Sequence, residues 1–393
     1  MVPEGWKLVT LGEVIHESAF GPRFSAELYS DNGNVGTIRT TDLDSEGNIN
    51  YKTIPYANLP DSFEAHYLKN NDLLITRSGT CGIPCLFEKQ DKPIIAGAFL
   101  IRFILKDNVH PKYIHSLLKS EHLQRDIHNL SSGGVQKNLS GTNLKKLKFI
   151  LPPLLEQKKI AQIISTWDMA IVNTERLLSN IQQQKKALTQ KIFTGKNRFS
   201  EFNEIWKSYK LSDLAMVQMG SSPKSEAYNE SGDGLPLIQG NADIKNRRSA
   251  PRIFTTEITK ECDVGDILLS VRAPVGTVAL SSHKACIGRG ISAIRANVGV
   301  SQDFLYQWFL WFEPRWGALS QGSTFESINS DDIKHLKIEL PGLEEQKKIA
   351  LSLFNVDQEI GLLQLNLSYL KQEKKALMQQ LLTGKRRVKV DAA

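Results

Sequence analysis

The chain contains one segment twice, and this internal repeat limits its possible folds more than any other feature. The stretch Glu156–Ala161 recurs letter for letter as Glu345–Ala350, and Lys185–Leu188 recurs as Lys374–Leu377. Both pairs are offset by 189 positions, as is the Thr-Gly-Lys sequence that follows each, so no insertion interrupts either copy. Identity at a fixed offset is the signature of repeated structural units. We therefore interpret the 393 residues as two copies of one unit.

The two copies are nearly identical in their last parts and only loosely alike in their first parts. Among the earlier landmarks, Trp6 matches Trp206, and Asn71–Leu74 resembles Gly265–Leu268. Surfaces that bind the same partner would stay alike, whereas surfaces that recognise different targets would diverge. Slower divergence of helices than of loops would give the same pattern, and the sequence leaves both explanations open.

The nearly identical parts have the pattern of long coiled-coil helices. Along Glu156–Phe193 the seam positions alternate in steps of four and three residues, and the second copy has the same spacing. A sustained repeat of 3.5 residues is typical of coiled coils, and Thr-Gly is a common helix end. We predict two helices of roughly 55 Å, at about 1.5 Å per residue, that pair with each other. The apolar seam residues are Ile160, Ile164, Trp167, Ile171, Leu178, Ile181, Leu188 and Ile192 in the first copy, and Ile349, Leu353, Val356, Ile360, Leu363, Leu367, Leu370, Leu377 and Leu381 in the second.

Two lysines occupy positions in these apolar seams. In a full antiparallel register, Lys185 lies opposite Asp357, and Lys374 lies opposite Asp168. We predict that these two ion pairs fix the register, which is an established use of polar seam residues. The alternative is that both ammonium groups extend to solvent along their apolar stems.

The first part of each copy predicts a mixed α/β (α+β) domain. In the first copy, Asp72–Arg77 and Pro93–Leu105 have strand character, and Pro111–Leu130 has helical periodicity. The fold class is therefore two tandem α/β domains joined by two long helices that form an antiparallel coiled coil. The predicted segments are 1–150 and 197–339 for the two domains, 151–196 and 340–385 for the helices, and 386–393 for a basic tail.

The second copy repeats this order of elements. Its strands match at Asp266–Arg272 and Ile287–Arg295, and a helix is expected from about Asp303 with Ser301 as its N-cap. This helix is rich in aromatic residues, which we expect in the core, with a base-stacking platform as the alternative. The aromatic residues are Phe304, Trp308, Phe309, Trp311 and Phe312.

Three polar, glycine-bearing loops lie at matching places in both copies. Their arginine, glutamine, asparagine, serine and threonine side chains match the donor and acceptor patterns of base edges. We predict that these loops contact nucleic acid, although such loops are also common as inert connections. The candidate residues are Arg39, Thr40, Thr41, Arg77, Ser78, Gly79, Gly133, Gln136, Lys137 and Asn138 in the first copy, and Gln239, Gly240, Asn241, Arg272, Gln321, Ser323, Thr324, Phe325 and Ser327 in the second.

Composition and missing motifs exclude several classes of protein. The net charge of +7 permits a polyanionic partner, and the four scattered cysteines are too few for a disulfide scaffold. The apolar runs are too short to cross a bilayer, and no secretory signal is visible, so we expect a soluble, cytoplasmic protein. We find no methyltransferase signature, no phosphate-binding loop and no metal-ligand pattern. The chain is therefore expected to have no catalytic residue, no metal and no cofactor of its own.

The doubled arrangement resembles the specificity (S) subunit of type I restriction–modification enzymes. The resemblance rests on Trp6 and Trp206, on the Asp-Leu-Leu and Asp-Ile-Leu strands, and above all on Leu-Pro-x-Leu-x-Glu-Gln-Lys-Lys-Ile-Ala at both helix starts. It implies two target-recognition domains, each reading one half of a split, asymmetric site in double-stranded DNA. It also implies two methyltransferase (M) subunits around the helical spacer and restriction-motor (R) subunits. S-adenosylmethionine, ATP and Mg would then belong to these partners.

The resemblance assigns the helices a double role as spacer and partner surface. As a spacer, the pair would act as a ruler that sets the distance between the two half-sites. The competing interpretation is a protein scaffold that does not bind DNA and whose polar loops are inert. The candidate spacer and partner-binding residues are Glu156, Gln157, Ile160, Ile164, Trp167, Ile171, Glu345, Gln346, Ile349, Leu353, Val356 and Ile360.

Overall fold

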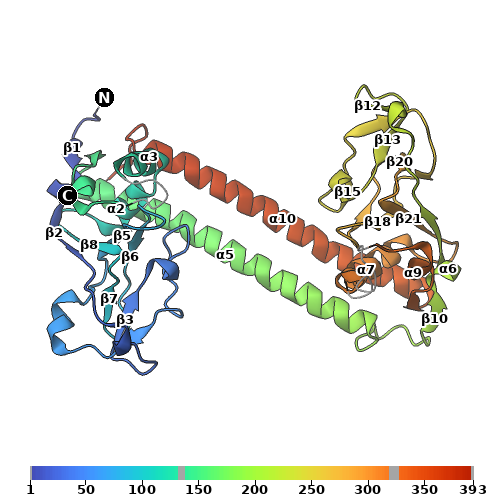
Figure 1. Cartoon of the computed structure of the whole chain (residues 1–393), viewed down its shortest axis with the longest axis horizontal. Coiled ribbons are helices and arrows are strands. Elements are labelled where there is room, and N and C mark those ends of the chain that lie inside the picture. The colour runs from blue at the N-terminus through green and yellow to red at the C-terminus, as the bar shows by residue number, and fades with distance from the viewer. Residues whose placement is uncertain (1, 132–137, 318–326, 391–393) are drawn as a thin grey trace. The chain divides into compact units, whose positions relative to one another are not determined.

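The computed structural model describes residues 2–131, 138–317 and 327–390, and their contacts form two units (Figure 1). Unit 1 consists of residues 1–175 and 366–393, and unit 2 consists of residues 176–365. The two long helices, α5 (Leu154–Phe193) and α10 (Leu343–Leu381), each contribute one half to each unit. The contacts thus divide the chain across the middle of both helices, whereas the predicted segments treated the helices as separate. Within the described residues, no helix is long and apolar enough to cross a membrane.

Unit 1 contains a four-stranded sheet in the order β2-β8-β5-β6, a three-stranded sheet in the order β4-β3-β7, and the antiparallel pair β1-β9. Strands β3 and β7 pair in parallel, and the other pairs are antiparallel. The strands are β1 (Lys7–Thr10), β2 (Ile15–Phe20), β3 (Val35–Ile38), β4 (Tyr56–Ala57), β5 (Leu73–Thr76), β6 (Pro84–Leu86), β7 (Ile94–Ala96), β8 (Leu100–Leu105) and β9 (Lys148–Leu151). The helices are α1 (Leu11–Val14), α2 (Pro111–Leu118), α3 (Glu121–Leu130) and α4 (Gly141–Lys145), with 3-10 turns η1 (Ala26–Leu28), η2 (Thr40–Asp42) and η3 (Asp61–His66).

Unit 2 repeats this plan with larger sheets. Its orders are β11-β21-β18-β19-β15-β14, β12-β16-β13-β20-β17 and the pair β10-β22, and the parallel pair β13-β20 matches β3-β7. The strands are β10 (Lys207–Lys210), β11 (Ala215–Met219), β12 (Tyr228–Asn229), β13 (Leu235–Ile238), β14 (Ile244–Lys245), β15 (Arg248–Ser249), β16 (Ile253–Thr255), β17 (Glu261–Cys262), β18 (Ile267–Ser270), β19 (Val278–Leu280), β20 (Ala285–Ile287), β21 (Ile291–Ala296) and β22 (Lys337–Leu340). The helices are α6 (Leu211–Leu214), α7 (Gln302–Phe312) and α9 (Ser330–Lys334), with 3-10 turns η4 (Ser225–Ala227), η5 (Asn241–Asp243) and η6 (Glu313–Arg315).

Two predicted elements are each divided in the structure. The run Pro93–Leu105 forms β7 and β8, because Gly97 turns the chain so close to the Ile38 carbonyl oxygen that an added Cβ would lie 2.7 Å from it. The predicted helix Pro111–Leu130 forms α2 and α3, because Ser120 has extended backbone and its hydroxyl donates to the Leu117 carbonyl. Both breaks depend on local backbone geometry that apolar periodicity does not record.

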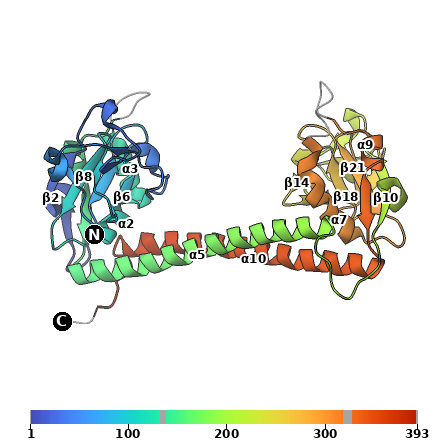
Figure 2. The same cartoon turned by 90° about the horizontal axis from the view of Figure 1, so that it is seen from below.

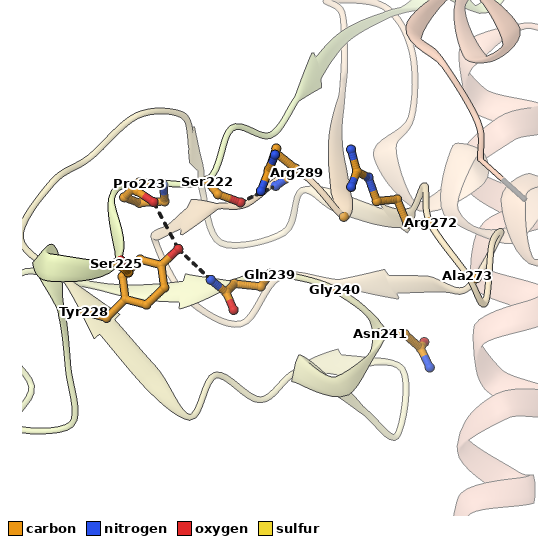
Figure 3. A pocket seen from close by; sticks show the side chains of 11 residues that line it. Ser222, Pro223, Ser225, Tyr228, Gln239, Gly240, Asn241, Arg272, Ala273 and Arg289 are labelled. Carbon is orange, nitrogen blue, oxygen red and sulfur yellow. Dashed lines mark hydrogen bonds between the residues drawn. The ribbon is translucent and has the colours of Figure 1, made fainter. Parts of the chain in front are cut away.

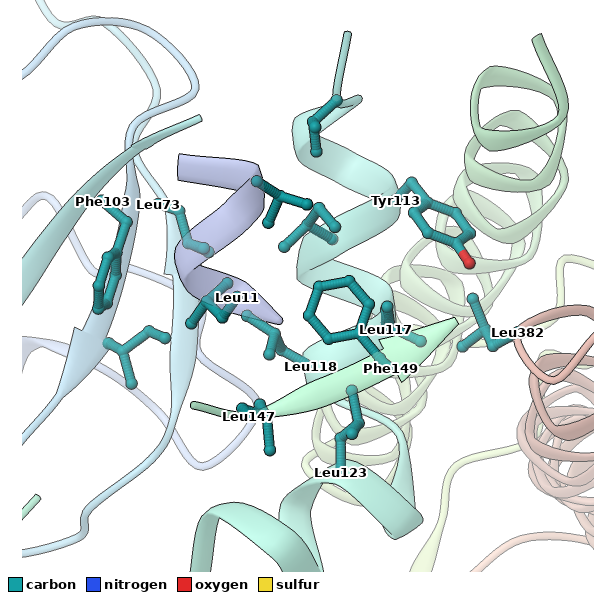
Figure 4. Close-up of a cluster of buried hydrophobic side chains, with 14 of the residues drawn as sticks. Leu11, Leu73, Phe103, Tyr113, Leu117, Leu118, Leu123, Leu147, Phe149 and Leu382 are labelled. Carbon is teal, nitrogen blue, oxygen red and sulfur yellow. The ribbon is translucent and has the colours of Figure 1, made fainter. Parts of the chain in front are cut away.

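The main core of each unit joins a sheet to the ends of both long helices. In unit 1, Leu73 and Phe103 of the sheet and Leu117 of α2 belong to the same buried cluster as Leu382, just after α10 (Figure 4). In unit 2, Ser301 caps α7 through its hydroxyl, as predicted, and the aromatic residues Phe304 and Trp308 are buried in the core. The prediction that these rings are core residues is therefore confirmed.

The two long helices lie side by side in each unit, as the predicted seam requires (Figure 2). Every predicted seam position is buried or partly buried, including both lysines. In unit 2 the Lys185 ammonium lies 2.5 Å from Asp357, and in unit 1 the Lys374 ammonium lies 2.5 Å from Asp168. The antiparallel register and both predicted ion pairs are thus confirmed. In unit 2 Asp357 also accepts a hydrogen bond from Gln307 of α7 at 3.0 Å.

We expect the ion pair between Lys185 and Asp357 to contribute measurably to unit 2. The Lys185 side chain is only 17% exposed, but Asp357 is 35% exposed, so solvent screens the attraction. A double-mutant cycle with K185A and D357A should give a coupling of about 0.5–1 kcal/mol in the free energy of unfolding. The pair Lys374–Asp168 should give less, because Asp168 is 50% exposed. Zero coupling in both cycles would rule out the proposed role of these pairs in fixing the register.

Candidate functional site

In unit 2, the predicted polar loops surround one open pocket of about 550 Å³. Gln239, Gly240 and Asn241 line it from the end of β13, and Arg272 lines it from the turn after β18 (Figure 3). The Gln239 amide is held by the Tyr228 hydroxyl at 2.8 Å. The third predicted loop also reaches this place, because Ser327 forms a β-bridge with Arg272. Tertiary structure therefore brings the described parts of all three loops together.

The pocket in unit 2 has an excess of positive charge. Arg272 and Arg289 both line it, and none of the described residues that line it is acidic. Neither guanidinium has a hydrogen bond or an ion pair with another residue in the described parts of the chain. Asp243 follows the predicted loop residues Gln239–Asn241, and its carboxylate already has partners. It accepts a hydrogen bond from the Gln239 backbone amide and forms an ion pair with Arg252. The pocket thus presents free, forked N–H donors to an anion or to base-edge acceptors.

In unit 1, two of the predicted loops meet in the same way. Ser78 forms a β-bridge with Asn138, and the Leu139 amide donates to the Arg77 carbonyl at 2.9 Å. The Arg77 guanidinium lies over the Phe20 ring, 4.4 Å from its centroid, and no other partner is seen for it among the described residues. Stacking holds the planar group in place and leaves its N–H donors available.

Arg39 is bound within its own loop. Its guanidinium donates to both carboxylate oxygens of Asp42, at 3.1 and 2.9 Å, and to the Thr53 carbonyl at 3.1 Å. The hydrogen bond to Asp42 raises the pKa of Arg39. This ion pair braces the turn that contains Thr40 and Thr41, so most of the Arg39 donors are already used inside the loop.

Several predicted contact residues lie outside the described residues, so the structure does not place them. In the first copy these are Gly133, Gln136 and Lys137, and in the second copy they are Gln321, Ser323, Thr324 and Phe325. Each of these two loops contributes its last residue to the described part of the site, Asn138 in the first copy and Ser327 in the second.

The predicted loops of Arg77 and Arg272 match, but the two arginines are not at equivalent positions. The Arg77 amide donates to the carbonyl of Phe99, and the matching bond in unit 2 runs from Val271 to Gly290. Arg272 therefore corresponds to Ser78, as their equivalent β-bridges also show. The two domains place arginine one residue apart on the same turn, which changes where each guanidinium can reach.

The structure adds a turn to the site that sequence reasoning missed. In unit 1, Gly97–Phe99 connects β7 to β8, and it bonds to Ile38 on one side and to Arg77 on the other. In unit 2, Gly288–Gly290 connects β20 to β21 and makes the matching bonds to Ile238 and Val271. The turn thus lies between two predicted loops in each domain. In the sequence, the one feature that could have indicated this turn is the arginine between two glycines in Gly288-Arg289-Gly290.

The identical Glu-Gln pairs at the helix starts form joints between each helix and its domain. Glu156 is buried and accepts from the Trp6 indole at 3.3 Å and from the Arg387 guanidinium at 2.9 and 2.5 Å. In unit 2, Glu345 accepts from Trp206 at 3.1 Å and from Arg198 at 3.0 and 2.7 Å. These hydrogen bonds raise the pKa of both arginines.

The glutamines complete the two joints. Gln157 accepts from the His110 amide at 2.8 Å, just before α2, and Gln346 accepts from the Ser301 amide at 2.8 Å, just before α7. Both glutamines are 1% exposed. The structure therefore places the Glu-Gln side chains inside the joints rather than on a partner surface, while the seam residues Ile160, Ile164, Trp167, Ile171, Ile349, Leu353, Val356 and Ile360 are buried or partly buried.

Comparison with known proteins agrees with the doubled fold. The family model of the type I restriction modification DNA specificity domain matches twice, at residues 3–183 and 203–372. The MjaX type I restriction enzyme specificity subunit of Methanocaldococcus jannaschii is 35% identical over 72% of this chain and 70% of its own. The MjaVIII specificity subunit of the same organism is 24% identical over 99% of this chain and 94% of its own. The crystal structure of an S subunit from M. genitalium has the same fold, with a TM-score of 0.66 at 18% identity over 97% of this chain and 96% of that one. The chain therefore belongs to the type I restriction–modification DNA specificity family, as a non-catalytic subunit that binds the DNA recognition site.

Proposed function

We propose that the chain reads a bipartite, asymmetric DNA site, with one half-site for each domain. The observation that carries this proposal is the pocket of unit 2, where the guanidinium groups of Arg272 and Arg289 have no partner among the described residues and no described lining residue is acidic. Free guanidinium groups in a polar pocket suit guanine edges or phosphates. The matching site in unit 1 has other side chains on the same backbone plan, so it would read a different sequence.

The long helices would bind the partner subunits of the complex. Outside the seam, α10 exposes apolar side chains that a single helix pair leaves uncovered, and α5 exposes a smaller set. Apolar groups exposed along a helix favour association with further helices. We assign this surface to two methyltransferase subunits, which would carry S-adenosylmethionine, while restriction subunits would carry ATP and Mg, all in the cytoplasm where the DNA lies. The exposed residues are Leu343, Leu351, Phe354, Leu362, Leu365 and Tyr369 on α10, and Leu155, Met169, Val172 and Leu177 on α5.

Methylome sequencing of cells with and without the chain, in the presence of its partner subunits, tests the proposal. We expect one split motif that is methylated only when the chain is present. A scaffold that does not bind DNA would leave methylation unchanged. The same experiment would identify the bases and the spacer length.

The variant R77A should relax the recognition of one half-site only. Arg77 is held on Phe20 with its donors free, and one bidentate base contact contributes about 1–3 kcal/mol of discrimination. Methylation at sites with one substituted base in that half should therefore rise by roughly 5- to 150-fold relative to the original motif. R125A, which removes an exposed arginine from α3 of the same unit, is the control. Equal weakening on all DNA would reassign Arg77 to a phosphate.

A further inference from the structure

The turn between β7 and β8 in unit 1, and between β20 and β21 in unit 2, is the element that the loop prediction did not include. We propose that this turn is a base-reading position in both domains, that Arg289 and Arg272 together read a guanine in the second half-site, and that Phe99 makes an apolar contact in the first. This inference rests on the proposed function and specifies which chemistry each domain uses.

The turn in unit 2 is held in place by hydrogen bonds to neighbouring segments. In unit 2, Gly288 donates to the Ile238 carbonyl at 2.8 Å, and the Gly290 carbonyl accepts from Val271 at 2.9 Å. The turn is therefore fixed between the loop that follows β13 and the loop that follows β18. The Arg289 amide is itself held by the Ser222 hydroxyl at 3.2 Å. The backbone of the turn is fixed on three sides, and the exposed Arg289 side chain lines the pocket. DNA binding would therefore cost little additional conformational entropy of the backbone.

The electrostatics of the pocket select the ligand. Arg289 and Arg272 lie in the wall of one pocket, and no acidic residue lines this wall among the described residues (Figure 3). Both guanidinium groups can donate hydrogen bonds into this pocket, and the major-groove edge of guanine presents two acceptors, O6 and N7. The Gln239 amide lies in the same wall, where it could contact the neighbouring base. Because phosphate also accepts from arginine, the experiment must separate base from backbone.

The matching turn in unit 1 carries the opposite chemistry. Ala98 takes the place of Arg289, and Phe99 takes the place of Gly290, as the shared hydrogen bonds of both turns establish. Phe99 is 56% exposed, although the strands on both sides of its turn begin or end in buried residues. An exposed ring at a reading position suits the methyl group of thymine, which is the apolar feature of the major groove. The same turn thus carries a cation, Arg289, in one domain and an apolar ring, Phe99, in the other.

The test uses the chain assembled with its methyltransferase subunits and a DNA library randomised around the wild-type motif. In R289A and in R272A, the preference for guanine at one position of the second half-site should fall by roughly 5- to 150-fold, while the first half-site stays unchanged. F99A should relax one position of the first half-site and leave the second unchanged. R315A is the control, because Arg315 belongs to the same unit but lies on the Trp311 ring outside the pocket.

Two outcomes would overturn the inference and leave the proposed function standing. One is that R289A and R272A weaken binding uniformly on all sequences and that each lowers the slope of the salt dependence by about one, which would make these arginines phosphate ligands. The other is an unchanged motif in all three variants, which would exclude the turn from recognition. By contrast, failure of the proposed function would appear earlier, as a wild-type complex with no split motif. Normal assembly and an intact opposite half-site confirm that each variant is folded.

Discussion

A heptad inserted into both long helices is expected to lengthen the unread spacer of the DNA site by about three base pairs. Seven helical residues add about 10.5 Å, and successive base pairs of B-DNA are about 3.4 Å apart. The insertions belong after Glu175 and after Leu365, at the boundary between the units. There they leave Lys374 with Asp168 and Lys185 with Asp357, and seven residues keep the seam in phase.

The original motif should then lose methylation by at least about 100-fold, because one domain would face the wrong bases and each mismatch costs about 1–3 kcal/mol. The measurement is the methylated motif of the double-insertion complex, in which both half-site sequences should persist at the new spacing. An insertion into α5 alone is the control, since it leaves the two helices unequal in length and should impair assembly. Full methylation at the original spacing would contradict the ruler.

Substitution of Glu156 by alanine is expected to destabilise unit 1 by about 1–3 kcal/mol, the cost of a buried donor without an acceptor. The donor is the Trp6 indole, which is 5% exposed and has Glu156 as its acceptor. Arg387 adds less, because its side chain is 41% exposed and water can replace the carboxylate. For a unit of this size the midpoint of thermal unfolding should fall by roughly 2–12 °C.

E156Q is the matched control, because it keeps an acceptor for Trp6 and removes only the charge. It should retain most of the stability, whereas E156A should not. The same comparison at Glu345 should affect unit 2, where Trp206 and Arg198 are the partners. If alanine and glutamine gave the same small change at both positions, the joints would contribute little, and the identity of the two Glu-Gln pairs would need another cause.

The long helices could be predicted in detail because their pattern is local. Helical periodicity places every seam residue on one face, and two equal seams in one chain leave few alternatives to antiparallel pairing. The position of Lys185 in its seam was enough to name Asp357 as its partner. The family could be recognised from the same repeat, because the residues most specific to the family lie at the starts of the two helices.

The roles of individual polar residues could not be predicted in the same way. Glu156 is repeated as Glu345, but the letters alone do not tell a buried joint from a partner surface. Arginine is a residue type that often contacts bases, yet the Arg39 guanidinium is bound to Asp42 inside its own loop. Whether a charged side chain is available to bind DNA depends on the residues that pack against it in the folded domain. Residue type alone does not identify those neighbours.

The duplication, the helix pair with its register, and the loops where recognition is expected all follow from patterns in the amino-acid sequence. Which side chains share a site depends on how the domains fold in three dimensions. Parallel pairing of β3 with β7 and of β13 with β20 joins strands that lie far apart in the chain, and this pairing carries Phe99 and Arg289 between the predicted loops. The physical reason is that helix pairing follows from short-range periodicity, whereas strand pairing between distant segments is set by the packing of the whole domain.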